Sequence, residues 1–134
     1  MLAVHKSTLL QSAFFGVTGV IVLALGAHAL EARLDAQSLN SVETAGLIQL
    51  IHAVVLLGLA QLSQLGKYFR WASLSIFWGT LLFSGSIYLL VFFKPIVPII
   101  RHLWPITPLG GMILIAGWLL LLKGGLSIQH NGKP

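Results

Sequence analysis

The stretch ETAGLIQLIHAVVLLGLAQLS, residues 43–63, decides the fold class of this chain. After its first residue it contains no Asp, Glu, Lys or Arg. A helix rises about 1.5 Å per residue, so a run of roughly 20 residues crosses the hydrocarbon core of a bilayer, which is about 30 Å thick. The stretch therefore predicts a membrane-spanning helix.

Three further apolar runs flank this one, at residues 8–29, 71–93 and 108–124. The last is apolar only to residue 122 and reaches across a bilayer when Lys123 and Gly124 are included. The 134 residues are 57% hydrophobic and only 8% charged, which is far from the balance of a water-soluble domain. We therefore expect an all-α integral membrane protein, one domain over residues 1–134, in which four antiparallel helices form a compact up-down bundle with both termini on the same side.

The first run has a second interpretation, because Ala27-His28-Ala29 resembles the cleavage site of a secretory signal peptide. Its apolar run is longer than the roughly 7 to 15 residues of such signals. We therefore expect a retained helix.

The basic residues indicate how this bundle is oriented. On the side of the termini the four-helix arrangement places Lys6, Lys67, Arg70, Lys123 and Lys133. On the other side it places Arg33, Lys94 and Arg101, together with all three acidic residues. Basic loops tend to stay in the cytoplasm, so both termini are predicted to be cytoplasmic. The charges are too scattered to support nucleic-acid binding, and the absence of cysteine excludes disulfides and thiolate metal sites.

Local signals predict where the helices begin. Asn40-Ser41-Val42-Glu43 resembles a capping box, and Thr107-Pro108 resembles an N-cap followed by a first helical residue. Residues 94–107 are apolar but rich in proline, which opposes a regular helix. We expect an irregular interfacial loop there. Trp104 in this loop and Trp71 at the start of the third helix are the predicted interface anchors.

Small residues predict where the helices approach one another, because close backbone packing supplies much of the association energy in lipid. The alternative is that glycine is simply common in membrane helices. The predicted packing positions are Gly16, Gly19, Gly26, Gly79, Gly85, Gly110, Gly111 and Gly117.

Polar side chains within and beside the spans are the candidate site residues. No acidic or basic residue lies deep in a span, so the coupling residue of most ion-driven transporters is missing. The polar candidates are His28, Glu43, Thr44, Gln49, His52, Ser84, Ser86 and Tyr88. His52 is expected to act mainly as a neutral imidazole that joins helices, and His28 to hydrogen-bond to Glu43 or Thr44.

The sequence contains no recognisable catalytic motif, so we predict a protein without enzymatic activity, catalytic residues, metal or cofactor. One alternative remains open, in which His28 and His52 on adjacent helices hold a haem or a metal in a redox protein. A second alternative is a small transporter or lipid-handling protein, which needs a water-accessible cavity around Gln49, His52, Ser84 and Tyr88.

Four sequence motifs, taken in this order along the chain, resemble those of one family: LALGAHAL (23–30), ETAGLIQLIHAVVLLGLA (43–60), LLFSGSIYLL (81–90) and TPLGGMILIAGWLLL (107–121). They are similar to the YgdD/YwdK-like small inner-membrane proteins, the domain of unknown function number 423, whose eukaryotic relatives include a mitochondrial four-span protein. The resemblance implies about four helices in a bacterial inner membrane, with no established activity. The matching positions include Gly26, His28, Glu43, Thr44, His52, Phe83, Ser84, Gly85, Ser86, Tyr88, Thr107, Pro108, Gly110, Gly111, Gly117 and Trp118.

The chain departs from the family pattern at residues 94–106, where a shorter connection is expected. This loop is therefore a candidate for contact with lipid or a partner. Together these features favour an accessory or assembly subunit of a larger membrane complex, or a self-associating membrane scaffold. Its expected partners are membrane lipids, other membrane protein subunits or further copies of the chain.

Overall fold

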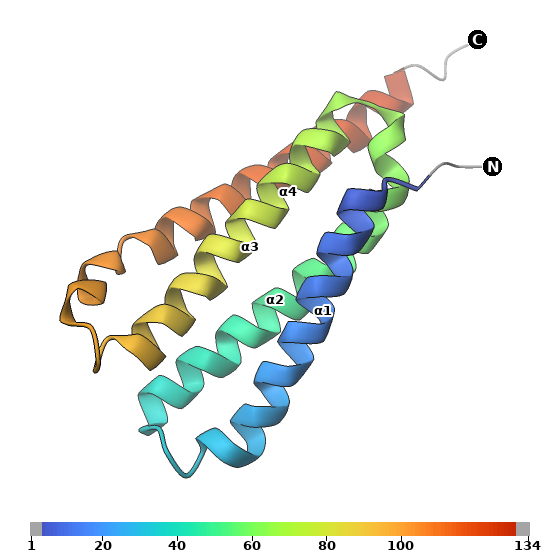
Figure 1. Cartoon of the computed structure of the whole chain (residues 1–134). Coiled ribbons are helices and arrows are strands. Elements are labelled where there is room, and N and C mark those ends of the chain that lie inside the picture. The colour runs from blue at the N-terminus through green and yellow to red at the C-terminus, as the bar shows by residue number, and fades with distance from the viewer. Residues whose placement is uncertain (1–3, 131–134) are drawn as a thin grey trace.

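The computed structural model describes residues 4–130, and these residues form four long helices joined by short connections. The helices are α1 (Lys6–Leu25), α2 (Ala36–Leu62), α3 (Lys67–Phe93) and α4 (Ile106–His130). Each runs antiparallel to the next, so the start of α1, the end of α4 and the α2–α3 connection share one end of the bundle (Figure 1). The described residues contain no strand, which confirms the predicted all-α bundle.

Three short elements connect or extend these helices. The π-helical turn η1 (Gly26–Leu30) prolongs α1, and the 3-10 turns η2 (Ser63–Leu65) and η3 (Pro98–Leu103) lie before α3 and α4. Gly66 separates η2 from α3 with φ +153° and ψ 174°, a conformation that is open almost only to glycine. A glycine is therefore needed to make the tight α2–α3 connection.

The start of α2 differs from the sequence expectation. The helix begins at Ala36, and its N-cap is Asp35 rather than Asn40 or Ser41. The Asp35 carboxylate accepts hydrogen bonds from the backbone N–H groups of Gln37 and Ser38, both at 3.0 Å, and from the Ser38 hydroxyl at 2.7 Å. Aspartate is as good an N-cap as asparagine or serine, so the earlier of the competing caps starts the helix. The bonds from Ser38 lower the pKa of the Asp35 carboxyl below its usual value.

The start of α4 also differs from the expectation. The helix begins at Ile106, so Thr107 lies in its first turn instead of capping it. The preceding loop is partly ordered as η3, because Pro98 occupies a first-turn position, where its missing N–H has no cost. The prolines of this loop therefore begin one turn, although they exclude a long helix.

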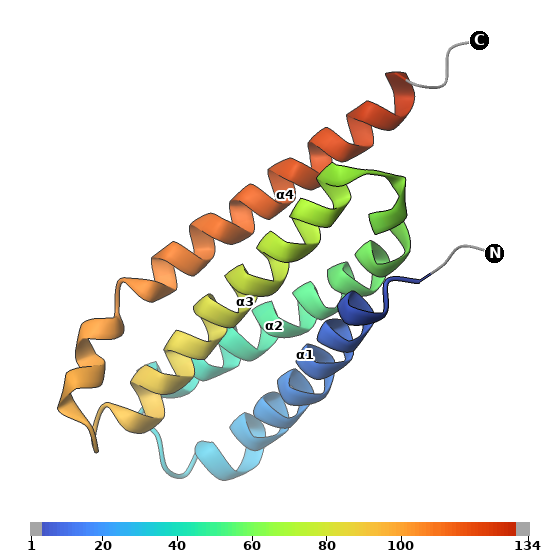
Figure 2. The same ribbon diagram turned by 45° about the horizontal axis from the view of Figure 1, so that its top comes forward.

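The helices pack in chain order, α1 on α2, α2 on α3 and α3 on α4 (Figure 2). A cluster of buried apolar side chains joins them: Phe15, Ala53, Leu56, Leu59, Phe69, Ala72, Ile76 and Leu114. The outer surface is also apolar, with Val17, Val54, Trp78 and Leu122 each more than 45% exposed. Four helices are long and apolar enough to cross a membrane. Such a surface suits hydrocarbon as the solvent, so the chain is an integral membrane protein.

Glycines bring α3 and α4 closest together. A Cβ atom on Gly110 would lie 2.5 Å from the backbone nitrogen of Phe83, and one on Gly79 would lie 2.8 Å from Leu114 Cγ. The contact at Gly110 is with backbone and cannot be relieved by a side-chain movement. Any larger residue at Gly110 would force the two helices apart.

The other predicted packing glycines fall into two groups. In the first group, a Cβ would touch a side chain of a neighbouring helix: Leu50 for Gly19, Glu43 for Gly26, Phe83 for Gly111 and Ile76 for Gly117. A Cβ on Gly16 or Gly85 would have nothing within 4 Å. These two glycines therefore leave open surface on α1 and α3.

Candidate functional site

The polar residues in the middle of the bundle centre on Gln49 of α2. Its side chain is only 4% exposed. Its amide Nε2 donates to the Phe15 carbonyl at 3.2 Å and to the Thr18 hydroxyl, both on α1. Its carbonyl oxygen accepts a hydrogen bond of 2.9 Å from the Tyr88 hydroxyl on α3. One amide group thus joins three helices, and both of its donor hydrogens are used.

A pocket of about 240 Å³ lies against this network, between α1 and α3. Its lining residues are Phe14, Phe15, Thr18, Val22, Gln49, Thr80, Leu81, Ser84, Gly85 and Tyr88. The hydroxyls on its wall are engaged elsewhere, because Thr80 donates to the Ile76 carbonyl at 2.7 Å and Ser84 to the Ala45 carbonyl at 2.9 Å. The pocket therefore presents mainly carbon and suits apolar matter.

His52 joins α2 to α4. Its Nδ1–H donates to the Ile48 carbonyl at 2.7 Å, and its Nε2 accepts from the Trp118 indole N–H at 3.2 Å. The tautomer follows from this network, because a carbonyl accepts and an indole N–H donates. Both ring nitrogens are occupied and the residue is 5% exposed, so His52 acts in this structure as a helix-joining residue.

The remaining polar candidates lie nearer the end of the bundle at which α1 is followed by α2 and α3 by α4. Ser86 donates to the Phe83 carbonyl at 3.0 Å and shares a 2.6 Å hydrogen bond with Thr107, which joins α3 to α4. His28 is exposed in η1, Thr44 is exposed, and Glu43 is half-buried. Within residues 4–130 the expected bond from His28 to Glu43 or Thr44 is not formed, because Gly26, and not His28, packs against the Glu43 side chain.

The predicted anchors and the histidine pair are placed as follows. Trp71 is 59% exposed near the start of α3 and Trp104 is 66% exposed just before α4, so they lie near opposite ends of the bundle. His28 lies in the η1 turn, whereas His52 is buried among α2 and α4. The described residues contain no group of three or more His, Cys, Asp or Glu that is arranged for a metal ion.

Sequence reasoning missed the polar contacts of α1. Thr8 shares a 3.1 Å hydrogen bond with Ser73 of α3, and Ser12 donates to the Ala53 carbonyl of α2 at 2.8 Å. A signal was available, since the buried residues Thr8, Ser12, Phe15 and Gly19 repeat every three to four positions along one face. In a membrane helix both the buried face and the lipid-facing side are apolar, so the pattern of apolar residues alone does not reveal the buried face.

The sequence profile of a family described as "Protein of unknown function (DUF423)" matches residues 22–111. The UPF0382 inner membrane protein YgdD of Escherichia coli (strain K12) is 34% identical over 125 residues, covering 89% of this chain and 91% of YgdD. A UPF0382 membrane protein of Staphylococcus saprophyticus is 37% identical over 106 residues, covering 78% of this chain and 84% of that protein. No solved structure matches. The four sequence motifs and these relatives agree, and the chain belongs to the DUF423 family of membrane proteins.

Proposed function

We propose that this chain is a non-enzymatic accessory or assembly subunit of the bacterial inner membrane, which packs its helices against those of another membrane protein. The observation that carries the proposal is the use of the central polar side chains. Gln49, His52, Ser84, Ser86 and Tyr88 each hydrogen-bond to another helix. Their bonding capacity is spent on holding the bundle together, which favours a structural role over catalysis or ion coupling.

A groove on the outer surface of α1 and α2 offers a place for such packing. It has a volume of about 320 Å³ and is lined by Leu9, Ser12, Ala13, Gly16, Leu50, Ala53, Val54 and Leu57. The small residues Ala13 and Gly16 would let another backbone approach closely. The occupant we assign to it is an apolar transmembrane helix of a partner subunit, because Ser12, the only hydroxyl in the lining, already donates to the Ala53 carbonyl.

Two matched glycine variants test this proposal. A Cβ on Gly16 or on Gly125 would meet nothing within 4 Å, so Gly16→Leu and Gly125→Leu should both fold. Only the first fills the groove. After gentle extraction from native membranes, we expect native mass spectrometry to show added protein mass on the 14.5 kDa chain, which Gly16→Leu removes and Gly125→Leu keeps.

The same experiment can contradict the proposal. A strictly monomeric chain, or equal loss of partner in both variants, would exclude assembly through this groove. Added mass in multiples of 14.5 kDa would identify the occupant as a second copy instead of a different subunit.

A second candidate function is lipid handling, which the 240 Å³ pocket beside Gln49 favours. Its carbon-rich wall fits an acyl chain rather than water or an ion. Gly85 lines this pocket and has open space around it, so Gly85→Phe should fill the pocket without disturbing the helices. Lipid that is retained by the natural chain and by Gly125→Phe, but lost from Gly85→Phe, would support this function, and equal retention in all three would oppose it.

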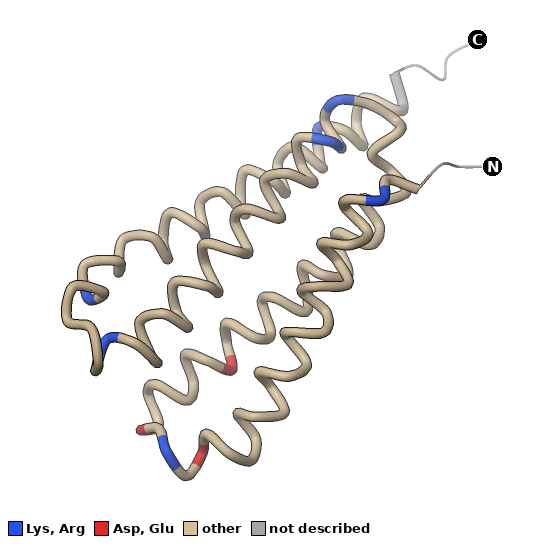
Figure 3. Tube along the Cα trace, in the orientation of Figure 1, with Lys and Arg blue, Asp and Glu red and all other residues tan. Residues whose placement is uncertain are grey.

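The orientation of the bundle is also a proposal. Lys6, Lys67, Arg70 and Lys123 lie at the end where α1 begins and α4 ends. Figure 3 shows the acidic positions toward the other end of the bundle. Positive ends of membrane helices favour the cytoplasm, so we place both termini there. A fluorescent reporter fused to the C-terminus should therefore be active, and an exported phosphatase reporter at the same position should be inactive.

A further inference from the structure

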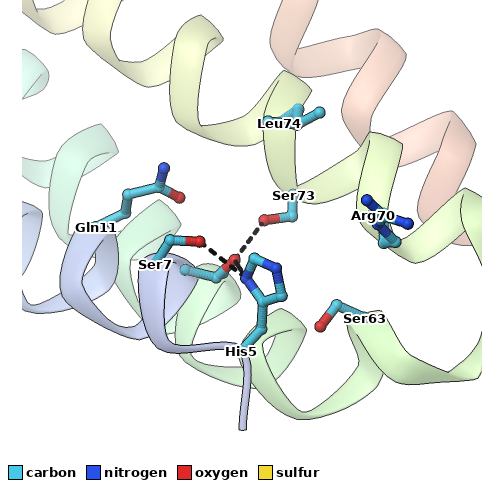
Figure 4. Close-up of a pocket in the computed structure, with 8 residues that line it drawn as sticks. His5, Ser7, Gln11, Ser63, Arg70, Ser73 and Leu74 are labelled. Carbon is cyan, nitrogen blue, oxygen red and sulfur yellow. Dashed lines mark hydrogen bonds between the residues drawn. The ribbon is translucent and has the colours of Figure 1, made fainter.

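The end of the bundle that carries Lys6, Lys67, Arg70 and Lys123 is its cationic end. A polar pocket at this end is not explained by helix packing. It lies where α1 begins, α2 ends and α3 begins, and has a volume of about 90 Å³ (Figure 4). A neighbouring space of about 280 Å³ opens beside it. His5, Ser63 and Arg70 line both spaces, so the two adjoin one another and share these three side chains.

Ser63 gives the strongest indication that a ligand is expected in this pocket. Its side chain is 5% exposed, and its Oγ is buried without a hydrogen-bond partner in the part of the chain that the structure describes. Buried hydroxyls almost always have a partner, because an unpaired one loses its bonds to water without replacement. Ser63 lines the pocket, and its unpaired hydroxyl gains a hydrogen-bond partner if rotation about χ1 brings the Oγ to a bound acceptor.

His5 is held in this pocket by several bonds. Its Nδ1 lies 2.9 Å from the Thr8 hydroxyl and 3.0 Å from the Ser7 hydroxyl, and Thr8 in turn bonds to Ser73. Its backbone N–H donates to the Ala60 carbonyl at 2.9 Å. The imidazole is therefore fixed with the Ser7 side on one flank and Ser63 and Arg70 on the other (Figure 4).

The charge of the surroundings selects an anion. Arg70 lies in the first turn of α3, whereas Glu31, Asp35 and Glu43 lie toward the opposite end of the bundle, so among residues 4–130 no acidic side chain is near it. Figure 3 shows the acidic positions gathered toward that other end. Lys67 and Lys123 lie over the Tyr68 ring, at 5.4 and 5.1 Å from its centroid, and add to the positive potential. The N-terminal end of α1 has no acidic residue in its first turn and no side-chain cap bond from His5, so the partial positive charge of the helix start adds to this region.

We propose that this pocket binds a phosphate group, with Arg70 as the charged ligand and Ser63 as the buried hydrogen-bond donor. A guanidinium presents paired N–H donors that match phosphate oxygens, and a neutral hydroxyl completes the bonding from the inner wall. The phosphate of an anionic phospholipid and soluble phosphate share this chemistry. The site lies at a helix end, and Trp71, which follows Arg70 in the chain, is exposed there. Exposed tryptophans at the ends of membrane helices are typical of the headgroup region, which favours the lipid as the source.

The test measures phosphate binding by the full chain in a neutral detergent. The probes are dioleoylphosphatidylglycerol, dioleoylglycerol as the lipid without a phosphate, and inorganic phosphate, each titrated by native mass spectrometry. We expect phosphatidylglycerol to bind, Arg70→Gln to weaken it about tenfold and Ser63→Ala about threefold. Arg70→Lys should lose less affinity than Arg70→Gln, because lysine keeps the positive charge but lacks the paired N–H donors of the guanidinium.

The control variants separate a built site from diffuse attraction. Arg33→Gln removes a charge from the opposite end and should change the affinity less than about twofold. Lys123→Gln removes a charge that contributes potential at the same end without lining the pocket, so it should weaken binding less than Arg70→Gln does. Equal weakening by Lys123→Gln and Arg70→Gln would overturn the proposal, as would failure of both lipid and phosphate to bind. Inorganic phosphate that binds more tightly than the lipid and displaces it at equal concentration would identify a soluble phosphate as the natural source. Binding of the lipid alone would identify the headgroup.

Ser63→Ala supplies a readout that a structural hydroxyl would not produce. Removing a buried, unpaired hydroxyl should leave the thermal stability of the ligand-free chain unchanged or raise it, while phosphate binding weakens. A fall in stability together with unchanged phosphate binding would assign Ser63 to the packing and overturn its role in the site.

Discussion

In the middle of the bundle, Gln49 donates both amide hydrogens to α1 and accepts a hydrogen bond from α3 with its carbonyl oxygen. At the cationic end, the equally buried hydroxyl of Ser63 has no hydrogen-bond partner within residues 4–130. The packing differs in the same way. Gly110 brings α4 against the backbone of Phe83 in the interior, while the end contains open spaces of about 90 and 280 Å³.

This contrast separates two uses of polar residues in a membrane protein. Polar side chains that bond to one another across helices specify how the helices pack and leave nothing to offer a ligand. A polar side chain that lines an open space without a partner retains that capacity. The site of interaction in this chain is therefore better sought at the bundle end and on the outer groove than among the histidines of the spans.

Gly110→Leu should have the largest effect on the middle of the bundle. The new Cβ would lie 2.5 Å from the Phe83 backbone nitrogen. Overpacking costs about 1–3 kcal/mol in the free energy of unfolding, and we expect the upper end of this range because a backbone atom cannot rotate away. Unfolding in mixed detergent and SDS measures this cost. Gly125→Leu on the same helix is the control, with an expected change near zero, and equal stability of the two variants would contradict the close α3–α4 contact.

Gln49→Leu should have the next largest effect, because it leaves the Tyr88 hydroxyl without its partner and removes the bonds from α2 to the Phe15 carbonyl and the Thr18 hydroxyl of α1. We expect a loss of about 1–3 kcal/mol in the free energy of unfolding. Tyr88→Phe in the Gln49→Leu background should then cost little more, since the hydroxyl that it removes is already unpaired. A double-mutant cycle measures this coupling, and strictly additive losses would show that the two side chains are independent.

Trp118→Phe should have a smaller effect, because it removes one hydrogen bond to His52 and keeps most of the aromatic contact. Interhelical bonds in membranes are worth roughly 0.6–2 kcal/mol, which is the loss expected on unfolding. The variant also tests the assignment of His52 as a helix-joining residue. Haem or metal that copurifies with the natural chain and is lost from His52→Ala would contradict that assignment.

Asp35→Ala should have the smallest effect, at a helix start that is exposed to solvent. The pKa of Asp35 is lower in the folded chain than in the unfolded chain, because Ser38 and Gln37 donate to its carboxylate. Its contribution to stability is therefore complete above the unfolded pKa, which is about 3.9, and is lost as the pH falls through the lower folded pKa. The difference in unfolding between the natural chain and Asp35→Ala should accordingly shrink in strong acid, where the carboxyl is neutral and keeps only uncharged acceptor oxygens. A difference that is the same in strong acid as at neutral pH would exclude the charged cap.

The sequence predicts much of this architecture but only part of the candidate sites. The number of helices, their antiparallel order and the polar candidates on α2 and α3 follow from the apolar runs and the positions of Gln49, His52, Ser84 and Tyr88. The starts of α2 and α4 do not, because several residues are competent caps and only neighbouring contacts decide between them. Ser63 and His5 were not predicted as site residues at all, since each is unremarkable until α1, α2 and α3 meet.

By itself, the sequence determined that the chain is embedded in the hydrocarbon core of a membrane and must be helical there. Long uncharged runs cannot be dissolved in water, and a backbone in lipid must satisfy its own hydrogen bonds. Only the tertiary structure decided which polar groups are paired, such as Gln49 with Tyr88 and His52 with Trp118, and that Ser63 is left unpaired beside Arg70. The physical reason is that the rotation and height of each helix depend on how all four pack, which no single segment encodes.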